Sequence, residues 1–114
     1  MDVIDVEGLR KMSGYDDSFV SEILKLFAER SAKDLDELSA ARKAGATNTV
    51  KFVVHRMRSA AVPLGLKELV VLLKKVELAI DDDESANLDK ELDTIEKITR
   101  EAIEHALLHL KVVS

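Results

Sequence analysis

The sequence contains no cysteine, and this absence excludes disulfide bridges, thiolate nucleophiles and thiolate metal ligands together. Turn-forming residues and aromatic residues are also scarce: the 114 residues include one proline, four glycines, three phenylalanines, one tyrosine and no tryptophan. So few turn formers, in a chain rich in Ala, Leu, Glu and Lys, favour helices over strands. The composition therefore predicts an all-α protein.

Long apolar runs and a surplus of positive charge are missing as well. No segment reaches the roughly 18 uninterrupted apolar residues that a membrane-spanning helix needs. The first residues lack the basic start and apolar stretch of a signal peptide, so we expect a cytoplasmic protein without membrane insertion. The formal net charge of −5 argues against a general nucleic-acid binder. The length predicts one domain over residues 1–114.

Apolar residues at helical spacing predict one short helix and four long ones. The short helix covers residues 6–12, and the third helix, which contains the candidate site, covers residues 47–64. The expected boundaries are the acidic pair Asp16-Asp17 before the second helix, Gly45 and Gly65 after the second and third, the run Asp81–Asp83 after the fourth, and a cap at Asp83 or Ser85 before the last.

Short connections between long amphipathic helices make neighbouring helices antiparallel. The expected fold is therefore an up-down four-helix bundle with a short extra N-terminal helix. The apolar stripe predicted for the second helix is Phe19, Ile23, Phe27, Leu35 and Leu38.

The third helix has two distinct faces when it is wound at about 100° per residue. One face gathers the apolar residues Val50, Val53, Met57, Ala60, Ala61 and Leu64. His55 points to the opposite side, away from the predicted core. Within about 60° of it, by the same winding, lie Lys51, Phe52, Arg58, Ser59 and Val62.

This surface contains what a phosphoryl carrier needs. A neutral imidazole nitrogen is a competent nucleophile, and nearby cations favour the neutral ring. Lys51 and Arg58 could pair with an anionic group on the ring. Ser59 is small and can donate a hydrogen bond, while Phe52 and Val62 offer an apolar rim for a partner. In the alternative interpretation His55 belongs to an ordinary solvated face, and the two apolar residues contact the short N-terminal helix.

The segment His55-Arg56-Met57-Arg58-Ser59-Ala60-Ala61-Val62-Pro63-Leu64-Gly65 resembles the signature of the histidine-containing phosphotransfer (HPt) domain family. The stretches 19–27 and 69–77 also resemble the family's first long helix and its apolar helix ending in Val-Glu or Leu-Glu. The similarity extends from about Val6 to Leu110. Three positions depart from the family pattern: Arg58 stands where Lys is usual, Ser59 stands where Gly is usual, and Pro63 near the end of the helix forfeits one backbone hydrogen bond and could kink it.

The resemblance implies a function and partners. His55 would accept a phosphoryl group from an aspartate of a response-regulator receiver domain and pass it to another receiver. Arg58, Lys51 and Ser59 would assist, and Phe52, Val62 and Arg56 would dock the partner. The other expected partner is a hybrid sensor histidine kinase. The carrier would be a monomer and no enzyme in its own right, with no ATP site or cofactor, and Mg²⁺ would sit on the receiver. A non-phosphorylated helical adaptor is the alternative.

Two further clusters were considered as cation sites. His105 and His109 lie four residues apart on the last helix, one turn after Glu101, a spacing that can supply two metal ligands. No third or fourth ligand is evident, so we predict no metal there. The acidic run from Asp81 to Glu84 lacks the alternating oxygen ligands and central glycine of an EF-hand loop, so we predict a solvated turn.

Overall fold

The structure, a computed structural model, describes residues 3–84 and 87–113, without the side chains of the last two. These residues form helices joined by short turns and contain no strand. The helices are α1 (Val6–Met12), α2 (Asp17–Ala44), α3 (Thr47–Ala61), the 3-10 turn η1 (Val62–Leu64), α4 (Lys67–Asp81) and α5 (Asp89–Val113). The all-α class and the short N-terminal helix are confirmed.

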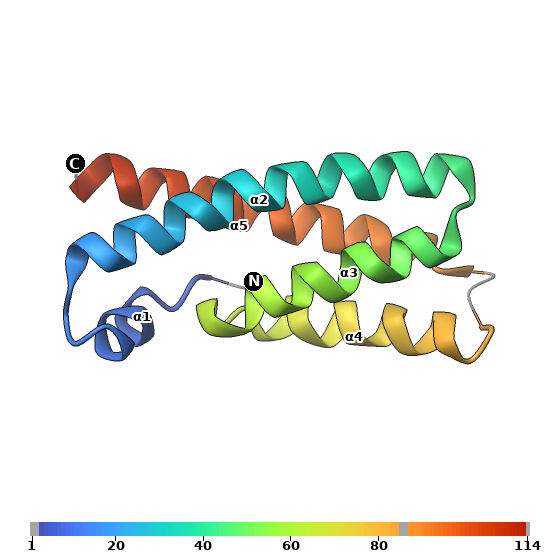
Figure 1. Ribbon diagram of the computed structural model, residues 1–114, viewed down its shortest axis with the longest axis horizontal. Coiled ribbons are helices and arrows are strands. Elements are labelled where there is room, and N and C mark those ends of the chain that lie inside the picture. Colours follow the sequence, from blue (N-terminus) through green and yellow to red (C-terminus); the bar gives the residue numbers. More distant parts are fainter. Residues whose placement is uncertain (1–2, 85–86, 114) are drawn as a thin grey trace.

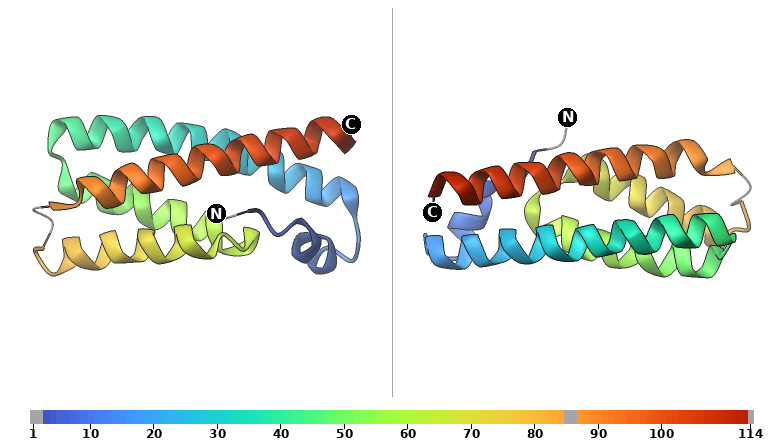
Figure 2. Two further views of the ribbon diagram at one scale, coloured as in Figure 1. Left: turned by 180° about the vertical axis from the view of Figure 1, so that it is seen from behind. Right: turned by 90° about the horizontal axis from the view of Figure 1, so that it is seen from above.

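The four long helices lie nearly parallel to the long axis of a molecule with extents of 44 × 21 × 21 Å. In Figures 1 and 2, α2 pairs with α5 and α3 pairs with α4, while α1 lies at the end where α2 begins and α5 finishes. Successive long helices run antiparallel, as their short connections require. The predicted up-down bundle is therefore confirmed. None of its described helices combines the length and apolar character needed to cross a bilayer.

One apolar core runs the length of the bundle and receives side chains from every helix. Its fully buried members include Leu24, Leu38, Val53, Val54, Leu73, Val76 and Ile95. The stripe predicted for α2 was wrong at one end: the Phe19 side chain is 48% exposed, because α2 extends past the end of α3 there. Winding also missed Val54, which is fully buried.

The ends of α2 follow their predicted caps. The carboxylate of Asp16 accepts a hydrogen bond from the Phe19 N–H at 3.2 Å, which satisfies one of the free donors of the first turn. At the other end Gly45 adopts a left-handed conformation with φ of 65° and donates to the carbonyl of Arg42. This conformation suits glycine, which has no Cβ to clash.

The connection between α4 and α5 differs from the prediction. Asp83 has a left-handed φ of 57° and follows α4, whereas α5 begins only at Asp89. Asp83 is therefore not the N-cap of the last helix. The other candidate cap, Ser85, lies outside the described residues.

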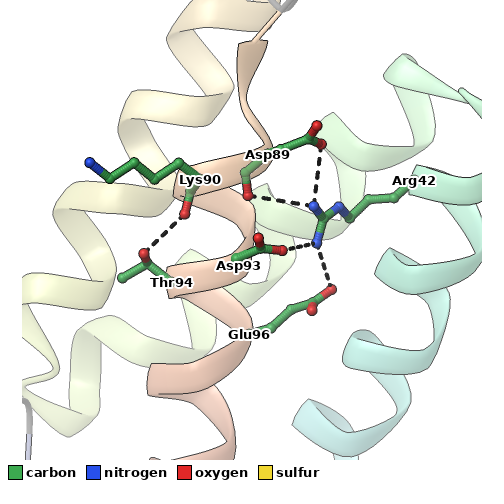
Figure 3. Close-up of polar contacts among 6 residues, drawn as sticks. All are labelled: Arg42, Asp89, Lys90, Asp93, Thr94 and Glu96. Atoms are coloured by element: carbon green, nitrogen blue, oxygen red, sulfur yellow. Dashed lines mark hydrogen bonds and ion pairs between the residues drawn. The ribbon is translucent and has the colours of Figure 1, made fainter.

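Arg42 joins α2 to the first turns of α5 (Figure 3). Its guanidinium contacts carboxylate oxygens of Asp93 at 3.0 Å, Glu96 at 3.2 Å and Asp89 at 3.3 Å. Burial lowers the pKa of Arg42, but hydrogen bonds to Asp93, Asp89 and Glu96 outweigh it and raise the pKa overall. The cluster orients α5 against α2 at the end of the bundle away from α1.

Two leucines of α4 test the burial pattern. Leu73 is fully buried and Leu78 is 51% exposed. We expect Leu73→Ala to lower the free energy of unfolding by about 2–5 kcal/mol, because it leaves a cavity in the core. Leu78→Ala, the same change five residues away, should stay within about 0.5 kcal/mol. Urea denaturation of both variants measures the difference, and similar losses would contradict the orientation of α4.

Candidate functional site

The site lies on the side of α3 that faces away from the core. Val50, Val53, Val54, Met57 and Ala61 are buried on one face of this helix. On the other face the His55 side chain is 56% exposed. The predicted separation of the two faces is confirmed, because the imidazole has no contact with the core and a partner can reach it.

The end of α3 is fixed by Pro63, Leu64 and Gly65, which follow the site in the sequence. The α-helix stops at Ala61 rather than at Leu64, and Pro63, which has no N–H to donate, lies in the tighter turn η1. Gly65 then takes a φ of 69°, and a Cβ built on it would lie 2.9 Å from the Cβ of Asp5. The Asp5 N–H donates to the Leu64 carbonyl at 2.8 Å. Gly65 thus allows the N-terminal segment to pack against the end of the helix.

Glu77 of α4 holds the His55 ring. The distance from Nδ1 of His55 to Oε1 of Glu77 is 2.8 Å, and the Glu77 side chain is only 15% exposed. An ionised carboxylate can only accept a hydrogen bond, so Nδ1 must be the donor. We therefore assign the hydrogen of the neutral ring to Nδ1, which leaves the lone pair on Nε2.

Arg58 completes a triangle with these two side chains. Its Nη2 lies 3.2 Å from Oε2 of Glu77 and 3.3 Å from Nδ1 of His55. Nδ1 cannot donate to Glu77 and accept from Arg58 at once, and the shorter contact to the carboxylate decides for Glu77. Oε2 of Glu77 has no hydrogen bond of good geometry, so Arg58 pairs with it by charge. The ring therefore faces one anion as well as the cations predicted from the sequence.

Lys51, the other predicted cation, is paired in the same way one turn earlier. Its Nζ contacts Oδ1 of Asp81 on α4. The hydrogen bond to Asp81 raises the pKa of Lys51, so its charge is retained across the neutral range. Asp81 was predicted to lie in a solvated turn. Instead it is the last residue of α4 and pairs with α3. Asp81 and Glu77 are four residues apart on α4, and because the two helices are antiparallel they face Lys51 and His55, which are four residues apart on α3.

Arg56 points to the other neighbour of α3. Its guanidinium contacts Asp34 at 2.8 Å and Glu37 at 2.5 Å, both on α2. Hydrogen bonds to Glu37 and then Asp34 raise the pKa of Arg56 against the opposing effect of burial. The Asp34 side chain is only 8% exposed, so Arg56 balances a carboxylate that would otherwise be buried without a partner. Arg56 was predicted to dock a partner, and the structure gives it this intramolecular role.

Ser59, Phe52 and Val62 surround His55 on the exposed face. The Ser59 hydroxyl donates to the carbonyl of His55 at 3.3 Å. Phe52 is 71% exposed and Val62 58% exposed, so neither packs into the core. They form an exposed apolar rim on either side of the imidazole.

The structure thus brings the predicted residues together and adds partners that the sequence reading missed. Glu77 was noted only for its place in the family pattern, and Asp81 and Asp34 were given no role at the site. A signal for the first two was present: Asp81 and Glu77 are spaced on α4 as Lys51 and His55 are on α3. Only the register of the two helices turns that spacing into contacts.

His105, one of the two histidines on the last helix, makes a hydrogen bond within the protein. Nδ1 of His105 accepts a hydrogen bond from the Ile4 N–H at 3.3 Å, and Ile4 is buried. Across the described part of the chain, no group of three or more His, Asp or Glu side chains converges on a possible metal position. His105 therefore helps to hold the N-terminal segment on the bundle.

Comparison with known proteins agrees with this geometry. The family model of the Hpt domain matches residues 22–111. The sensor protein EvgS of Escherichia coli strain K12 is 30% identical over 82 residues, which cover 72% of this chain but 7% of that protein. EvgS of Escherichia coli O157:H7 gives the same figures. No solved structure matches. An exposed histidine on a bundle helix and a family match over most of the chain lead to one conclusion: the chain belongs to the HPt domain family, the phosphocarrier modules of two-component phosphorelays.

Proposed function

We propose that His55 accepts a phosphoryl group from a phosphorylated aspartate of a receiver domain and passes it to the aspartate of another receiver. The observation that carries this proposal is the geometry of the ring. Nδ1 is occupied by Glu77, and the side chain is 56% exposed on a face without core contacts. Nε2 is therefore the nitrogen available to an incoming phosphorus atom.

The transfer step follows from this arrangement. The Nε2 lone pair attacks phosphorus in line, the P–N bond forms, and the P–O bond to the aspartate breaks so that the carboxylate leaves. Positive charge develops on the imidazole as the bond forms. The carboxylate of Glu77, already hydrogen-bonded to Nδ1, stabilises that charge. We expect Mg²⁺ and the residues that bind it to belong to the receiver, and the carrier to have no ATP site or cofactor of its own.

Arg58 and Lys51 are placed to meet the phosphoryl group. Each pairs with a carboxylate of α4, and both are partly exposed to solvent. The Lys51–Asp81 pair is exposed and such pairs contribute only about 0–1 kcal/mol, so moving Lys51 to a phosphoryl group costs little. Arg58 keeps its contact with Glu77, whose side chain is only 15% exposed. Ser59, one turn after His55, is small enough to let the receiver approach.

The relatives suggest the partners. EvgS is a sensor protein, and the 7% of it that aligns here is a small part of its length. We infer that the phosphoryl donor is the receiver of a hybrid sensor histidine kinase and that the acceptor is a response-regulator receiver. We expect the carrier to be a cytoplasmic monomer.

Replacing each histidine identifies the phosphorylated residue. Incubation with phosphorylated receiver domains should give an acid-labile, base-stable label on the wild-type chain. His55→Gln should remove the label, whereas His105→Gln and His109→Gln should keep it, with circular dichroism confirming that each variant folds. Label on His105 or His109 would refute the proposed site. A wild-type chain that binds receivers but gains no label would favour the adaptor.

Glu77 should act by positioning the ring. We expect Glu77→Gln to slow transfer at saturating receiver by about tenfold, because the amide carries no charge to stabilise the ring. The share of ring hydrogen on Nδ1, read from ¹⁵N NMR shifts of His55, should also fall. Glu91→Gln, the same substitution at a carboxylate that pairs with Lys75 away from His55, is the control and should change neither quantity. A Glu77→Gln protein with an unchanged tautomer and rate would contradict this role.

Phe52 should serve docking rather than folding. Because its ring is 71% exposed, we expect Phe52→Asp to change the free energy of unfolding by no more than about 0.5 kcal/mol. Receiver binding should weaken nonetheless, because the interface would bury a carboxylate without a partner. Leu108→Asp, at a 62% exposed leucine of α5, is the control and should leave binding unchanged. A strongly destabilised Phe52→Asp protein would show that Phe52 belongs to the core.

A further inference from the structure

A groove of about 580 Å³ with several charged residues in its lining lies between α2 and α3 and includes the Arg56 ion pairs already described. Its residues include Arg30, Lys33, Asp34 and Glu37 from α2, and Arg56 and Ser59 from α3. Ser59 is one helical turn from His55 and donates to its carbonyl. The groove therefore opens beside the imidazole, on the side away from α4.

Only some of the charged residues in this groove form ion pairs with one another. Asp34 and Glu37 both contact Arg56. Arg30 and Lys33 are exposed, and within the described residues neither makes an ion pair. The groove thus presents two cations without intramolecular partners, on a chain whose net charge is −5. On the α4 side, by contrast, Lys51 and Arg58 are each held by a carboxylate.

We propose that Arg30 and Lys33 bind carboxylates on the surface of the receiver domain and so determine which receivers dock productively. This inference rests on the proposed function, since it needs a receiver at His55. The partner it specifies presents an acidic segment beside its phosphorylated aspartate, on the side that meets α2. No internal ion pair of Arg30 or Lys33 has to break for them to bind it.

The charge of the rest of the chain makes this contact selective. An acidic segment is repelled by a chain with a net negative charge and is attracted where two unpaired cations lie together. The receiver is thereby oriented with its acidic segment over α2 and its apolar surface over Phe52. Charges at the edge of an interface act mainly on the association rate and its dependence on salt.

The test compares two variants with the same change in charge. The first, Arg30→Glu with Lys33→Glu, reverses the groove cations. The control, Lys25→Glu with Lys97→Glu, reverses two exposed lysines that do not line the groove. The probe is the receiver domain that binds the wild-type chain most tightly. Its affinity is measured by fluorescence anisotropy at several salt concentrations, and transfer is measured separately at saturating receiver.

We expect the groove variant to bind the receiver about tenfold more weakly at low salt, since two attractions become repulsions. Wild-type binding should weaken as salt is added, whereas binding of the groove variant should strengthen, because salt screens its repulsions. Transfer at saturating receiver should stay within about twofold of wild type, because neither residue contacts the ring. The control should match wild type in all three measurements.

Several results would overturn the proposal: an unchanged affinity in the groove variant, an equal loss in the control, or wild-type binding that does not depend on salt. The anisotropy result also separates the two proposals. If the receiver binds but no phosphoryl group is transferred, phosphotransfer is refuted, and the affinities of the variants still test the role of Arg30 and Lys33. If the receiver does not bind at all, both proposals are refuted. The neutral variant Arg30→Gln with Lys33→Gln, checked by circular dichroism, should show a smaller loss in the same direction.

Discussion

The position of α3 between α2 and α4 determines what each residue of the site can do. One face of α3 is buried in the core, so the residues next to that face turn toward one neighbouring helix or the other. Arg56 meets α2, while Lys51 and Arg58 meet α4. His55 lies between these two sets, and its side chain is 56% exposed. Without the buried face, the helix could rotate and none of these pairings would be fixed.

The fold could be predicted well from the sequence because it depends on local patterns. Asp16 and Gly45 act through the backbone of their own turns, and the apolar spacing of α3 requires no knowledge of its neighbours. Phe19 was misplaced for the opposite reason: its burial depends on whether another helix reaches that end of α2, which local spacing does not contain.

Only the site residues on α3 could be predicted from the sequence. His55, Phe52, Ser59 and Val62 follow from winding α3 alone, and their exposure is confirmed. The carboxylates that pair with His55, with Arg56 and with the two cations are on other helices, 19 residues or more away in the sequence. Sequence reasoning therefore identified the cations but not the carboxylates that hold them, because the register between α3 and α4 comes from packing.

The paired cations change how the electrostatics of the site should be understood. The sequence alone predicts Lys51 and Arg58 as unpaired cations that can bind a phosphoryl group. In the structure both pair with carboxylates of α4, whereas the unpaired cations of the groove belong to α2. The two proposals therefore place ring chemistry and partner choice on different sides of α3. Glu77 and Arg58 contact the His55 ring, while Arg30 and Lys33 line the groove and make no contact with the ring. Under these proposals, a substitution on α2 alters which receiver binds while leaving His55 and its carboxylate partner unchanged.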